Sequence, residues 1–255
     1  MDESDQNGAG ERVARRLARA GVCSRREAER LIAAGRVAVN GWTLSTPALR
    51  IMPADYVTLD GTVLAKPAPT RLWRYHKTRG LVVTHRDPDG RQTVFAALPG
   101  DLPRVVSVGR LDIASEGLLL LTNDGALARR LEMPANGWIR RYRVRVHGVV
   151  DPAYLARLTR GITINGTTYG PIQATLDRIQ GSNAWLTVSL HEGRSREIRH
   201  VMEESGWPVN RLIRVAYGPF QLGNLAARAV EEVSGKVLRE QLGRGNIPPR
   251  RRKTG

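Results

Sequence analysis

The sequence predicts an α+β protein in which a small helix–helix–hairpin unit precedes a larger, mainly antiparallel domain of mixed α/β structure. Two helix signals lie close together near the N-terminus and are followed by a hairpin turn. A proline-containing stretch then separates this unit from a long series of short strands joined by turns. Strands joined by hairpins, with occasional helices, favour an antiparallel sheet over a parallel doubly wound one.

The first elements are read from capping signals. Residues 1–10 are acidic and polar, so we expect a disordered tail rather than a signal peptide. Glu11–Ala20 is predicted to form a short basic helix. A second helix should start at Ser24, because Ser24 and Glu27 have the spacing of a capping box. Gly35 should end it, since glycine favours helix C-termini.

A hairpin completes the first unit. Arg36–Val39 and Trp42–Leu44 flank an Asn40–Gly41 turn, and this dipeptide is a strong hairpin signal. One more short strand is expected at Val57–Leu59. The first unit therefore covers residues 11–63.

The larger domain is predicted to begin after a linker at residues 64–70, whose prolines favour extended backbone, and to cover residues 71–242. Its first clear strands are expected at Val105–Leu111 and Leu118–Thr122, with a polar loop between them. Ile139–Gly148 alternates between apolar and polar residues, as a half-buried strand does.

The rest of the larger domain should combine helices with hairpins. Asp151–Pro152 is expected to begin a helix, because aspartate caps a helix and proline fits its first turn. Further elements are expected as antiparallel pairs within 162–169 and 174–190, a helix at Ser195–Ser205 and a last clear strand at Val209–Val215.

The charge is strongly basic. The chain has 40 Lys and Arg residues against 24 Asp and Glu residues, a net charge of +16. Such an excess indicates a polyanionic partner, which is RNA, DNA or an anionic membrane. The longest apolar run, Gly117–Leu121, is far too short to span a bilayer, so a membrane is the weakest of the three. The single cysteine, Cys23, excludes a disulfide framework and fits a reduced cytoplasm. Residues 243–255 are predicted to be a basic tail.

Arginines are concentrated in the predicted helix pair. Between Glu11 and Arg36 the sequence has eight arginines and three acids. Arginine suits phosphate because its planar guanidinium donates two hydrogen bonds at once. A solvated helical face is the alternative explanation of such a run. The candidate RNA contacts in this unit are Arg12, Arg15, Arg25, Arg26, Arg30 and Arg36.

Asp112 is the strongest candidate for chemistry. It lies in the polar loop between two apolar strands, where Gly109 and Gly117 leave space for backbone or substrate to approach. A carboxylate in such a loop can act as a base or as a nucleophile. Its local pattern alone favours another role, because an aspartate near a serine is more often a turn-former.

Arg196 and Arg199 form a second candidate group at the start of the predicted helix. Being three residues apart, they are expected to share a helical face and to bind phosphate or pair with a buried acid, although ordinary surface charge is the simpler explanation. The sequence has no phosphate-binding or dinucleotide-binding glycine motif and no His/Cys/acid cluster with metal-ligand spacing. We therefore expect no cofactor and no metal.

Two resemblances narrow these alternatives. RVARRLARAGVCSRREAERLIAAGRVAVNG, Arg12–Gly41, resembles the RNA-binding domain named after ribosomal protein S-four. The segment GRLDIASEGLLLLTNDG, Gly109–Gly125, resembles the signature of the ribosomal pseudouridine synthase family. Three later blocks follow in the family's order, RRYRVRVHG at 140–148, LHEGRSREIRHVMEESG at 190–206 and VNRLIRVAYGPF at 209–220. Together the resemblances cover roughly residues 11–240 and imply an RNA-docking unit followed by a catalytic domain.

The second resemblance also implies roles for individual residues. Asp112 corresponds to the catalytic aspartate and Tyr142 to a tyrosine that stacks on the target base. Arg199 corresponds to an arginine that pairs with the aspartate, and Leu212 to a buried leucine of the same site. Further RNA contacts are expected at Lys77, Arg110, Arg196 and Arg214. Departures from the family pattern are Thr78, Ser115, Ser195 and His200, none of which removes a catalytic residue type.

The implied reaction is the isomerisation of uridine to pseudouridine in ribosomal RNA, without a cofactor. The favoured substrate is large-subunit (23S) RNA in a precursor or assembly intermediate, and small-subunit RNA is the alternative. A non-catalytic RNA-binding assembly factor would explain the charge and the first unit equally well. It would not explain why Asp112, Tyr142 and Arg199 occur together in family order. An RNA methyltransferase is a third hypothesis, but the sequence has no recognisable methyl-donor loop.

Overall fold

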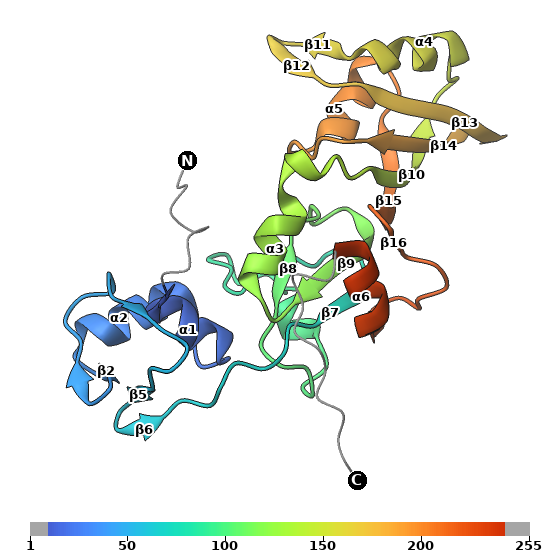
Figure 1. Cartoon of the computed structure of the whole chain (residues 1–255). Helices are drawn as coiled ribbons and strands as arrows, with labels where there is room; N and C mark the ends of the chain where they lie inside the picture. The colour runs from blue at the N-terminus through green and yellow to red at the C-terminus, as the bar shows by residue number, and fades with distance from the viewer. Residues whose placement is uncertain (1–9, 243–255) are drawn as a thin grey trace. The chain divides into compact units, whose positions relative to one another are not determined.

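A computed structural model of the chain describes residues 10–242 (Figure 1). These residues form two compact units, 10–70 and 71–242. Each unit has its own buried hydrophobic cluster.

The first unit consists of two helices and two small antiparallel sheets. Its elements are β1 (Glu11–Arg12), α1 (Val13–Arg19), α2 (Arg25–Ala33), β2 (Val37–Val39), β3 (Trp42–Thr43), β4 (Arg50–Ile51), β5 (Val57–Leu59) and β6 (Thr62–Val63). The strands pair in the orders β1-β4 and β3-β2-β5-β6. Leu17 and Ile32 of the two helices are fully buried in one cluster with Val37 of β2.

Local signals in this unit work as predicted, with one exception. The Ser24 hydroxyl accepts a hydrogen bond of 3.1 Å from the Glu27 amide and caps α2. Asn40 and Gly41 have φ angles of 51° and 86°, as a two-residue hairpin turn requires. The prediction that the first helix starts at Glu11 is wrong, because Glu11 pairs with Ile51 in the β1-β4 ladder and α1 starts after it.

The second unit is built on one large sheet. Its elements are β7 (Leu72–Lys77), η2 (Phe95–Ala97), β8 (Val106–Val108), β9 (Glu116–Thr122), α3 (Gly125–Glu132), η3 (Pro134–Asn136), β10 (Arg140–His147), α4 (Pro152–Arg157), η4 (Leu158–Arg160), β11 (Ile162–Ile164), β12 (Thr167–Tyr169), β13 (Ile172–Gln180), β14 (Asn183–Leu190), α5 (Glu197–Glu204), β15 (Val209–Tyr217), β16 (Phe220–Gln221), β17 (Val230–Glu232) and α6 (Gly235–Leu242). The sheet order is β13-β14-β10-β15-β9-β7-β17, with β16 beside β15 and β8 beside β9. Its strand pairs are antiparallel except β9–β15.

Hydrophobic clusters cover opposite faces of this sheet. In β9, Leu119 and Leu121 belong to one cluster, whereas Leu118 and Leu120 belong to the other. Successive side chains of a strand point to opposite faces, so the two clusters lie on opposite sides of the sheet. The first cluster includes residues of α4 and α5, and the second includes residues of α3 and α6. Figure 1 shows α4, α5, β11 and β12 on one side of β13, β14 and β10.

The predicted α+β architecture is confirmed, and the differences lie at element ends and in elements that were not predicted, such as β4, β17 and α6. β8 stops at Val108, so the polar loop begins earlier than the predicted strand Val105–Leu111 implied. Gly109 turns the chain there with a φ of 65°. The predicted basic tail, residues 243–255, lies outside the described residues. None of the described helices is long and apolar enough to cross a membrane.

Gly117 is where the two parallel strands meet. It pairs with Arg214 of β15 on one side and with Lys77 of β7 on the other. Its φ is 101°, and a Cβ placed on it would lie 2.3 Å from the Arg214 carbonyl oxygen. Only glycine tolerates both constraints, so this residue sets how closely β9 and β15 approach.

We predict that Gly117→Ala destabilises the protein by roughly 3 kcal/mol or more, because it combines an unfavourable φ with a backbone clash. Thermal unfolding of the full chain measures this. Gly125→Ala is the matched control, since Gly125 lies in the first turn of α3 with an ordinary φ and nothing within 4 Å of the added Cβ. The control should be neutral or more stable by about 0.4–1 kcal/mol. Equal effects of the two substitutions would contradict this account of Gly117.

Candidate active site

Three candidate residues and Gly117 share one line across the sheet. Tyr142 of β10 pairs with Arg214 of β15, Arg214 pairs with Gly117 of β9, and Gly117 pairs with Lys77 of β7. Directly paired residues in a sheet present their side chains to the same face. With strands spaced about 4.8 Å apart, Tyr142 lies only two strand spacings, about 10 Å, from Gly117. The polar loop that contains Asp112 leads directly into this line.

Lys77 holds that loop from inside the protein. Its side chain is fully buried, and its ammonium group donates to the carbonyl oxygens of Thr78, Asp112 and Ser115 at 3.1, 3.0 and 2.8 Å. These three bonds use all three protons of the ammonium group. Burial lowers the pKa of Lys77 to about 8, although Asp112 and Glu116 act in the opposite direction.

Two arginines hold the middle of the loop. Arg199 of α5 donates to the carbonyl oxygens of Ala114 and Val209 at 3.3 and 3.0 Å. Arg79 donates to the same Ala114 oxygen at 3.3 Å and to Asn210 at 2.7 Å. Burial lowers the pKa of Arg199, and the neighbouring Arg196 lowers it further, while Asp112 raises it. The loop is therefore attached to both β15 and α5 through its backbone.

Arg214 fixes the start of the loop. It is buried, and its Nε donates to the Leu118 carbonyl at 2.8 Å, while one Nη lies 3.5 Å from the Arg110 carbonyl. Its guanidinium also lies 5.2 Å from the ring centre of Tyr217. Backbone carbonyls, not carboxylates, thus receive the hydrogen bonds of Lys77, Arg199 and Arg214.

Asp112 is held by its backbone while its carboxylate is free. Its carbonyl accepts from Lys77 and also from the Ser115 amide at 3.0 Å, which closes a turn. In the part of the chain that the structure describes, no hydrogen bond or ion pair within 4.0 Å engages the Asp112 side chain. The turn-forming role and the chemical role are therefore compatible, because they use different atoms of the same residue.

Several buried polar atoms around the loop lack partners within residues 10–242. They are Thr78 Oγ1, Ser115 Oγ, Arg199 Nε and Arg214 Nη2. Burying a polar group without a hydrogen bond costs about 1–3 kcal/mol each. The residues that carry these atoms also hold the loop, either through a side chain or through a carbonyl that Lys77 bonds. Such a concentration of unsatisfied buried atoms is typical of a catalytic site, where polar groups are held in place at a cost in stability.

One hydrophobic cluster supports the site from below. Tyr142 and Leu212 are buried in it, at 8% and 5% exposure. The cluster also contains Leu111, which precedes Asp112, and Ile198, which precedes Arg199. The four segments that carry the candidate residues are therefore fixed by the same packing.

Comparisons with known proteins identify the family. Residues 71–204 match the family model described as RNA pseudouridylate synthase, and residues 11–55 match the S4 domain model. A protein of Rickettsia prowazekii, described as an uncharacterized RNA pseudouridine synthase, is 45% identical over 232 residues, which cover 91% of this chain and 97% of the relative. The chain belongs to the RNA pseudouridylate synthase family.

Other similar proteins in this family have more specific names. A protein of Escherichia coli O6:H1 named ribosomal large subunit pseudouridine synthase B is 41% identical, over 83% of this chain and 75% of the relative. One of Haemophilus influenzae with the same name is 43% identical, over 84% of this chain and 61% of the relative. A solved pseudouridylate synthase shares the fold, with a TM-score of 0.62 at 22% identity, covering 91% of this chain and 99% of that one.

The structure of this pseudouridine synthase changes the roles expected for two residues of the catalytic domain. Lys77 and Arg214 were expected to contact RNA, but both are buried and donate to backbone carbonyls. Arg110 and Arg196 are exposed, as an RNA contact requires. Arg196 and Arg199 do not share a helical face, because α5 starts after Arg196, which caps it with a φ of 54°. This conformation is uncommon for a non-glycine residue and separates exposed Arg196 from buried Arg199.

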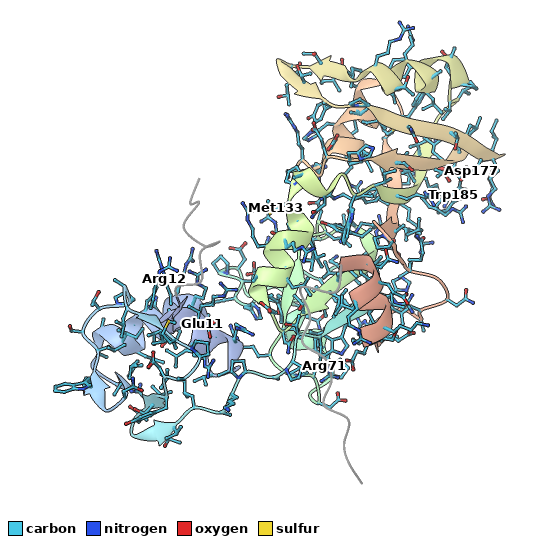
Figure 2. All side chains as sticks on the ribbon, in the orientation of Figure 1. Glu11, Arg12, Arg71, Met133, Asp177 and Trp185 are labelled. Carbon is cyan, nitrogen blue, oxygen red and sulfur yellow. The ribbon has the colours of Figure 1, made fainter. Side chains whose placement is uncertain are left out.

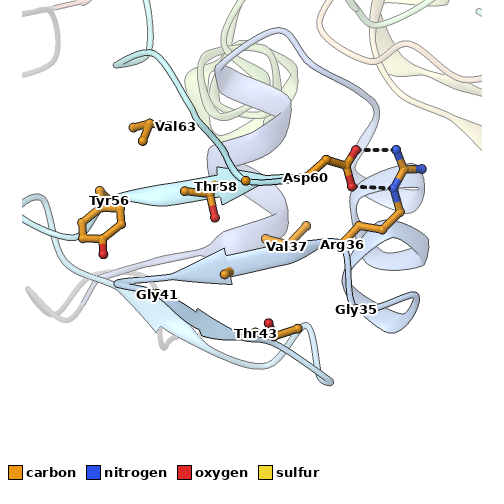
Figure 3. Close-up of a pocket in the computed structure, with 11 residues that line it drawn as sticks. Gly35, Arg36, Val37, Gly41, Thr43, Tyr56, Thr58, Asp60 and Val63 are labelled. Atoms are coloured by element: carbon orange, nitrogen blue, oxygen red, sulfur yellow. Dashed lines mark hydrogen bonds and ion pairs between the residues drawn. The ribbon is translucent and has the colours of Figure 1, made fainter.

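The S4 domain divides its candidate arginines into two groups. Arg12, Arg25 and Arg26 are exposed and form no ion pair with a described residue. The others are paired: Arg15 lies 4.0 Å from Glu11, Arg30 lies 3.2 Å from Glu27 and Arg36 lies 2.6 Å from Asp60. Figure 3 shows the double hydrogen bond of Arg36 and Asp60 beside a shallow hollow on the sheet. The hollow contains none of the catalytic candidates.

Sequence analysis missed the inward role of Lys77, although the sequence carries a signal for it. Trp73, Tyr75 and Lys77 alternate along β7, and the first two are buried in one cluster. Period-two alternation therefore places Lys77 on the same buried face. Arg79 was also missed, and no pattern in the sequence links it to Ala114 across the loop.

We predict that turnover at saturating RNA falls with an apparent pKa of about 8 as pH rises, because Lys77 then loses the proton that completes its three carbonyl bonds. Lys77→Met should lower turnover at pH 7 by roughly a hundredfold, since small displacements of a catalytic loop cost about that much. The remaining turnover of this variant should no longer fall between pH 7 and 9.

Unfolding measurements give an independent check, because the free energy of unfolding should rise over the pH range in which turnover is low. The folded pKa of Lys77 lies below its ordinary value of 10.5, so the unfolded chain binds more protons between pH 8 and 10.5. The contribution of Lys77 to the free energy of unfolding should therefore rise over this range. Wild type should gain stability relative to Lys77→Met between pH 8 and 10. A turnover that stays flat in wild type up to pH 9 would contradict this assignment.

Proposed function

We propose that this protein isomerises a uridine to pseudouridine in ribosomal RNA of the large subunit, with Asp112 as the catalytic carboxylate. Family membership supports the reaction type. The names of the Escherichia coli and Haemophilus influenzae relatives favour the large subunit. The observation that carries the choice of Asp112 is a free carboxylate on a backbone held by buried cations.

The reaction rearranges bonds within one nucleotide. The N1–C1′ bond breaks, the uracil turns, and C5 forms a bond to C1′. C5 loses its proton and N1 gains one, so substrate and product are isomers and no group donor enters the balance. In this proposal the Asp112 carboxylate starts the reaction, either by attacking C1′ or by removing the proton of C2′.

The cations around the loop are suited to keeping that carboxylate in position. Lys77, Arg199 and Arg214 fix the backbone of the loop at Asp112, Ala114 and Arg110, and no hydrogen bond from them to the carboxylate oxygens is present in the described residues. We therefore assign Arg199 to positioning and electrostatic support of Asp112, in place of the direct pairing that the family resemblance implied. Arg199 Nε and Arg214 Nη2 are buried without partners among the described residues, so these two arginines act on the reacting groups through their charge and not through direct contact.

Tyr142 is the proposed platform for the target base. A uridine must leave its stack to reach a recessed site, at a cost of roughly a few kcal/mol. Stacking on an aromatic ring offsets about 1–3 kcal/mol of this cost. Tyr142 lies two strands away from Gly117, where the Asp112 loop joins the sheet, so a base against its ring would lie near the Asp112 loop. Leu212, two residues before Arg214 on the same strand, belongs to the buried hydrophobic cluster that contains Tyr142.

We predict that Asp112→Asn lowers turnover at saturating RNA by at least roughly a thousandfold, because an amide neither attacks C1′ nor accepts the C2′ proton. Its affinity for RNA should change by less than about threefold, which is about 0.6 kcal/mol. Purified protein and large-subunit RNA are sufficient for both measurements. Asp101→Asn is the matched control, since Asp101 is exposed on a surface loop, and it should behave as wild type.

Two outcomes would contradict this proposal in different ways. Substantial turnover by Asp112→Asn would mean that another group performs the chemistry. Wild-type protein that binds large-subunit RNA without forming pseudouridine would favour the alternative of a non-catalytic binding role on that RNA.

The S4 domain is proposed to dock the RNA without taking part in the bond chemistry. We predict that Arg25→Gln combined with Arg26→Gln weakens RNA binding and lowers the slope of log affinity against log salt by about 1.4–1.8, which is two phosphate contacts. Arg30→Gln combined with Arg36→Gln removes the same charge from arginines that already have acidic partners. This control should change the slope much less. Equal slopes for the two double variants would contradict the docking role of Arg25 and Arg26.

A further inference from the structure

A second basic surface lies on the catalytic domain, on the face of the sheet opposite Tyr142. The side chains of β10 alternate, so that Tyr142 and Val144 enter the buried cluster while Arg143 and Arg145 point to the other side. Within residues 10–242 the helices that pack on β10, β13 and β14, which are α4 and α5, lie on the Tyr142 side. The Arg143 side of these strands has no helical cover.

One transverse row on this side is made almost entirely of arginine. Arg178 of β13 pairs with Trp185 of β14, Trp185 pairs with Arg145 of β10, and Arg145 pairs with Arg211 of β15. Arg143, on the next exposed position of β10, lies with its guanidinium 4.8 Å from the ring centre of Trp185. We call these four arginines, Arg143, Arg145, Arg178 and Arg211, the arginine face. Figure 2 labels Trp185 near the end of its strand, with Asp177 of β13 beside it.

The arginine face is unfavourable for the isolated protein. Like charges directly opposite each other in a sheet are destabilising, and Arg145 and Arg211 are such a pair. Among the residues that the structure describes, only Arg211 of the four has an acidic partner, Glu116 at 2.9 Å. Asp177 precedes Arg178 on β13, and it accepts a hydrogen bond from the Thr187 hydroxyl. Arg145 Nε is buried without a partner. An anionic ligand at the surface would reduce the repulsion between these arginines.

Trp185 supports the guanidinium group of Arg143 by stacking against it. The Arg143 guanidinium lies over one face of the ring, 4.8 Å from its centre, so that face is not open to a nucleobase. Its stacking with Arg143 fixes that side chain and leaves the guanidinium donors directed outward. The row spans three strand spacings, about 14 Å. A nucleic acid duplex carries several phosphates over that length.

We propose that the arginine face binds the phosphate backbone of the substrate RNA outside the segment that enters the Asp112 site. The inference rests on RNA being the substrate, and it adds a docking surface on the reverse side of the catalytic sheet. Because Trp185 is covered, the contacts are to phosphates and carry no base specificity. RNA that reaches both faces must pass around an edge of the sheet, so a longer RNA gains more from this surface than a short stem-loop.

The test uses full-length protein with the three substitutions Arg143→Gln, Arg145→Gln and Arg178→Gln, and protein-free large-subunit RNA as the probe. Removing three phosphate contacts should lower the slope of log affinity against log salt by about 2–3. At low salt the affinity should fall by roughly tenfold to a hundredfold. Turnover at saturating RNA should stay within twofold of wild type, since the arginine face is on the opposite side of the sheet from Tyr142.

The matched control removes the same charge elsewhere on the catalytic domain. Arg86, Arg157 and Arg160 are exposed, and the last two lie on α4 and η4 on the covered side. Their triple Gln variant should keep most of the wild-type affinity and slope. An equal loss in both triple variants would mean that only net charge matters and would overturn the proposal. Affinity and slope unchanged in the arginine-face variant would overturn it as well.

A second variant keeps the test decisive if Arg145→Gln disturbs folding. Arg143 and Arg178 are both exposed, so their double Gln variant should fold, with a melting temperature within a few degrees of wild type. It should show about two thirds of the change in slope. A wild-type protein that makes no pseudouridine would refute the proposed function, whereas the comparison of binding slopes would still decide the role of the arginine face.

Discussion

The catalytic domain depends on the buried ammonium group of Lys77, whose strand β7 pairs with β9, which in turn pairs with β15. Lys77 donates all three of its protons to carbonyl oxygens, two of them in the loop that contains Asp112. The arrangement requires a glycine at position 117, because any side chain there would meet the backbone of Arg214. The glycine and the lysine are directly paired, so the closeness of β9 to β15 and the shape of the loop are set together. The resulting geometry fixes the backbone of Asp112 before any substrate arrives.

Cations that bond to backbone carbonyls place positive charge near Asp112 while its carboxylate stays free to react. If Arg199 formed a tight ion pair with Asp112, the carboxylate would have to break that pair in order to react. Here Arg199 instead holds Ala114 and Val209, and the Asp112 side chain has no hydrogen-bond partner among the described residues. The positive charges nevertheless lie close enough to interact with the Asp112 carboxylate, since Asp112 raises the pKa of both Lys77 and Arg199 against the effect of burial. Catalytic sites commonly use such preorganised charge.

The arginines of this chain fall into classes that the net charge alone does not separate. Some are structural, as Arg214 is under the loop and Arg36 is beside Asp60. Others, such as Arg25 and Arg26, are exposed and have no acidic partner within residues 10–242, so they are candidates for binding RNA phosphate. Arg143 and Arg178 of the arginine face belong with the second class, and they lie on the side of the sheet that carries no catalytic candidate. RNA binding spread over several surfaces suits a large, structured substrate, because each surface contributes affinity without adding base contacts at the site of reaction.

The sequence by itself determined much of this protein. Local signals placed the Ser24 cap, the Asn40–Gly41 turn and most strands, because caps, turns and alternation depend on residues that are near one another in the chain. The order of motifs also identified the family and singled out Asp112. Tertiary structure decided which charges are buried. Lys77 and Arg214 are of the residue types that commonly bind RNA, yet both donate hydrogen bonds to carbonyls of the Asp112 loop. For Lys77 the bonded carbonyl of Ser115 is 38 residues away in sequence. Likewise, the row of Arg178, Trp185, Arg145 and Arg211 exists only through strand register. Register is fixed by packing between strands that are distant in sequence, so no local pattern reveals it.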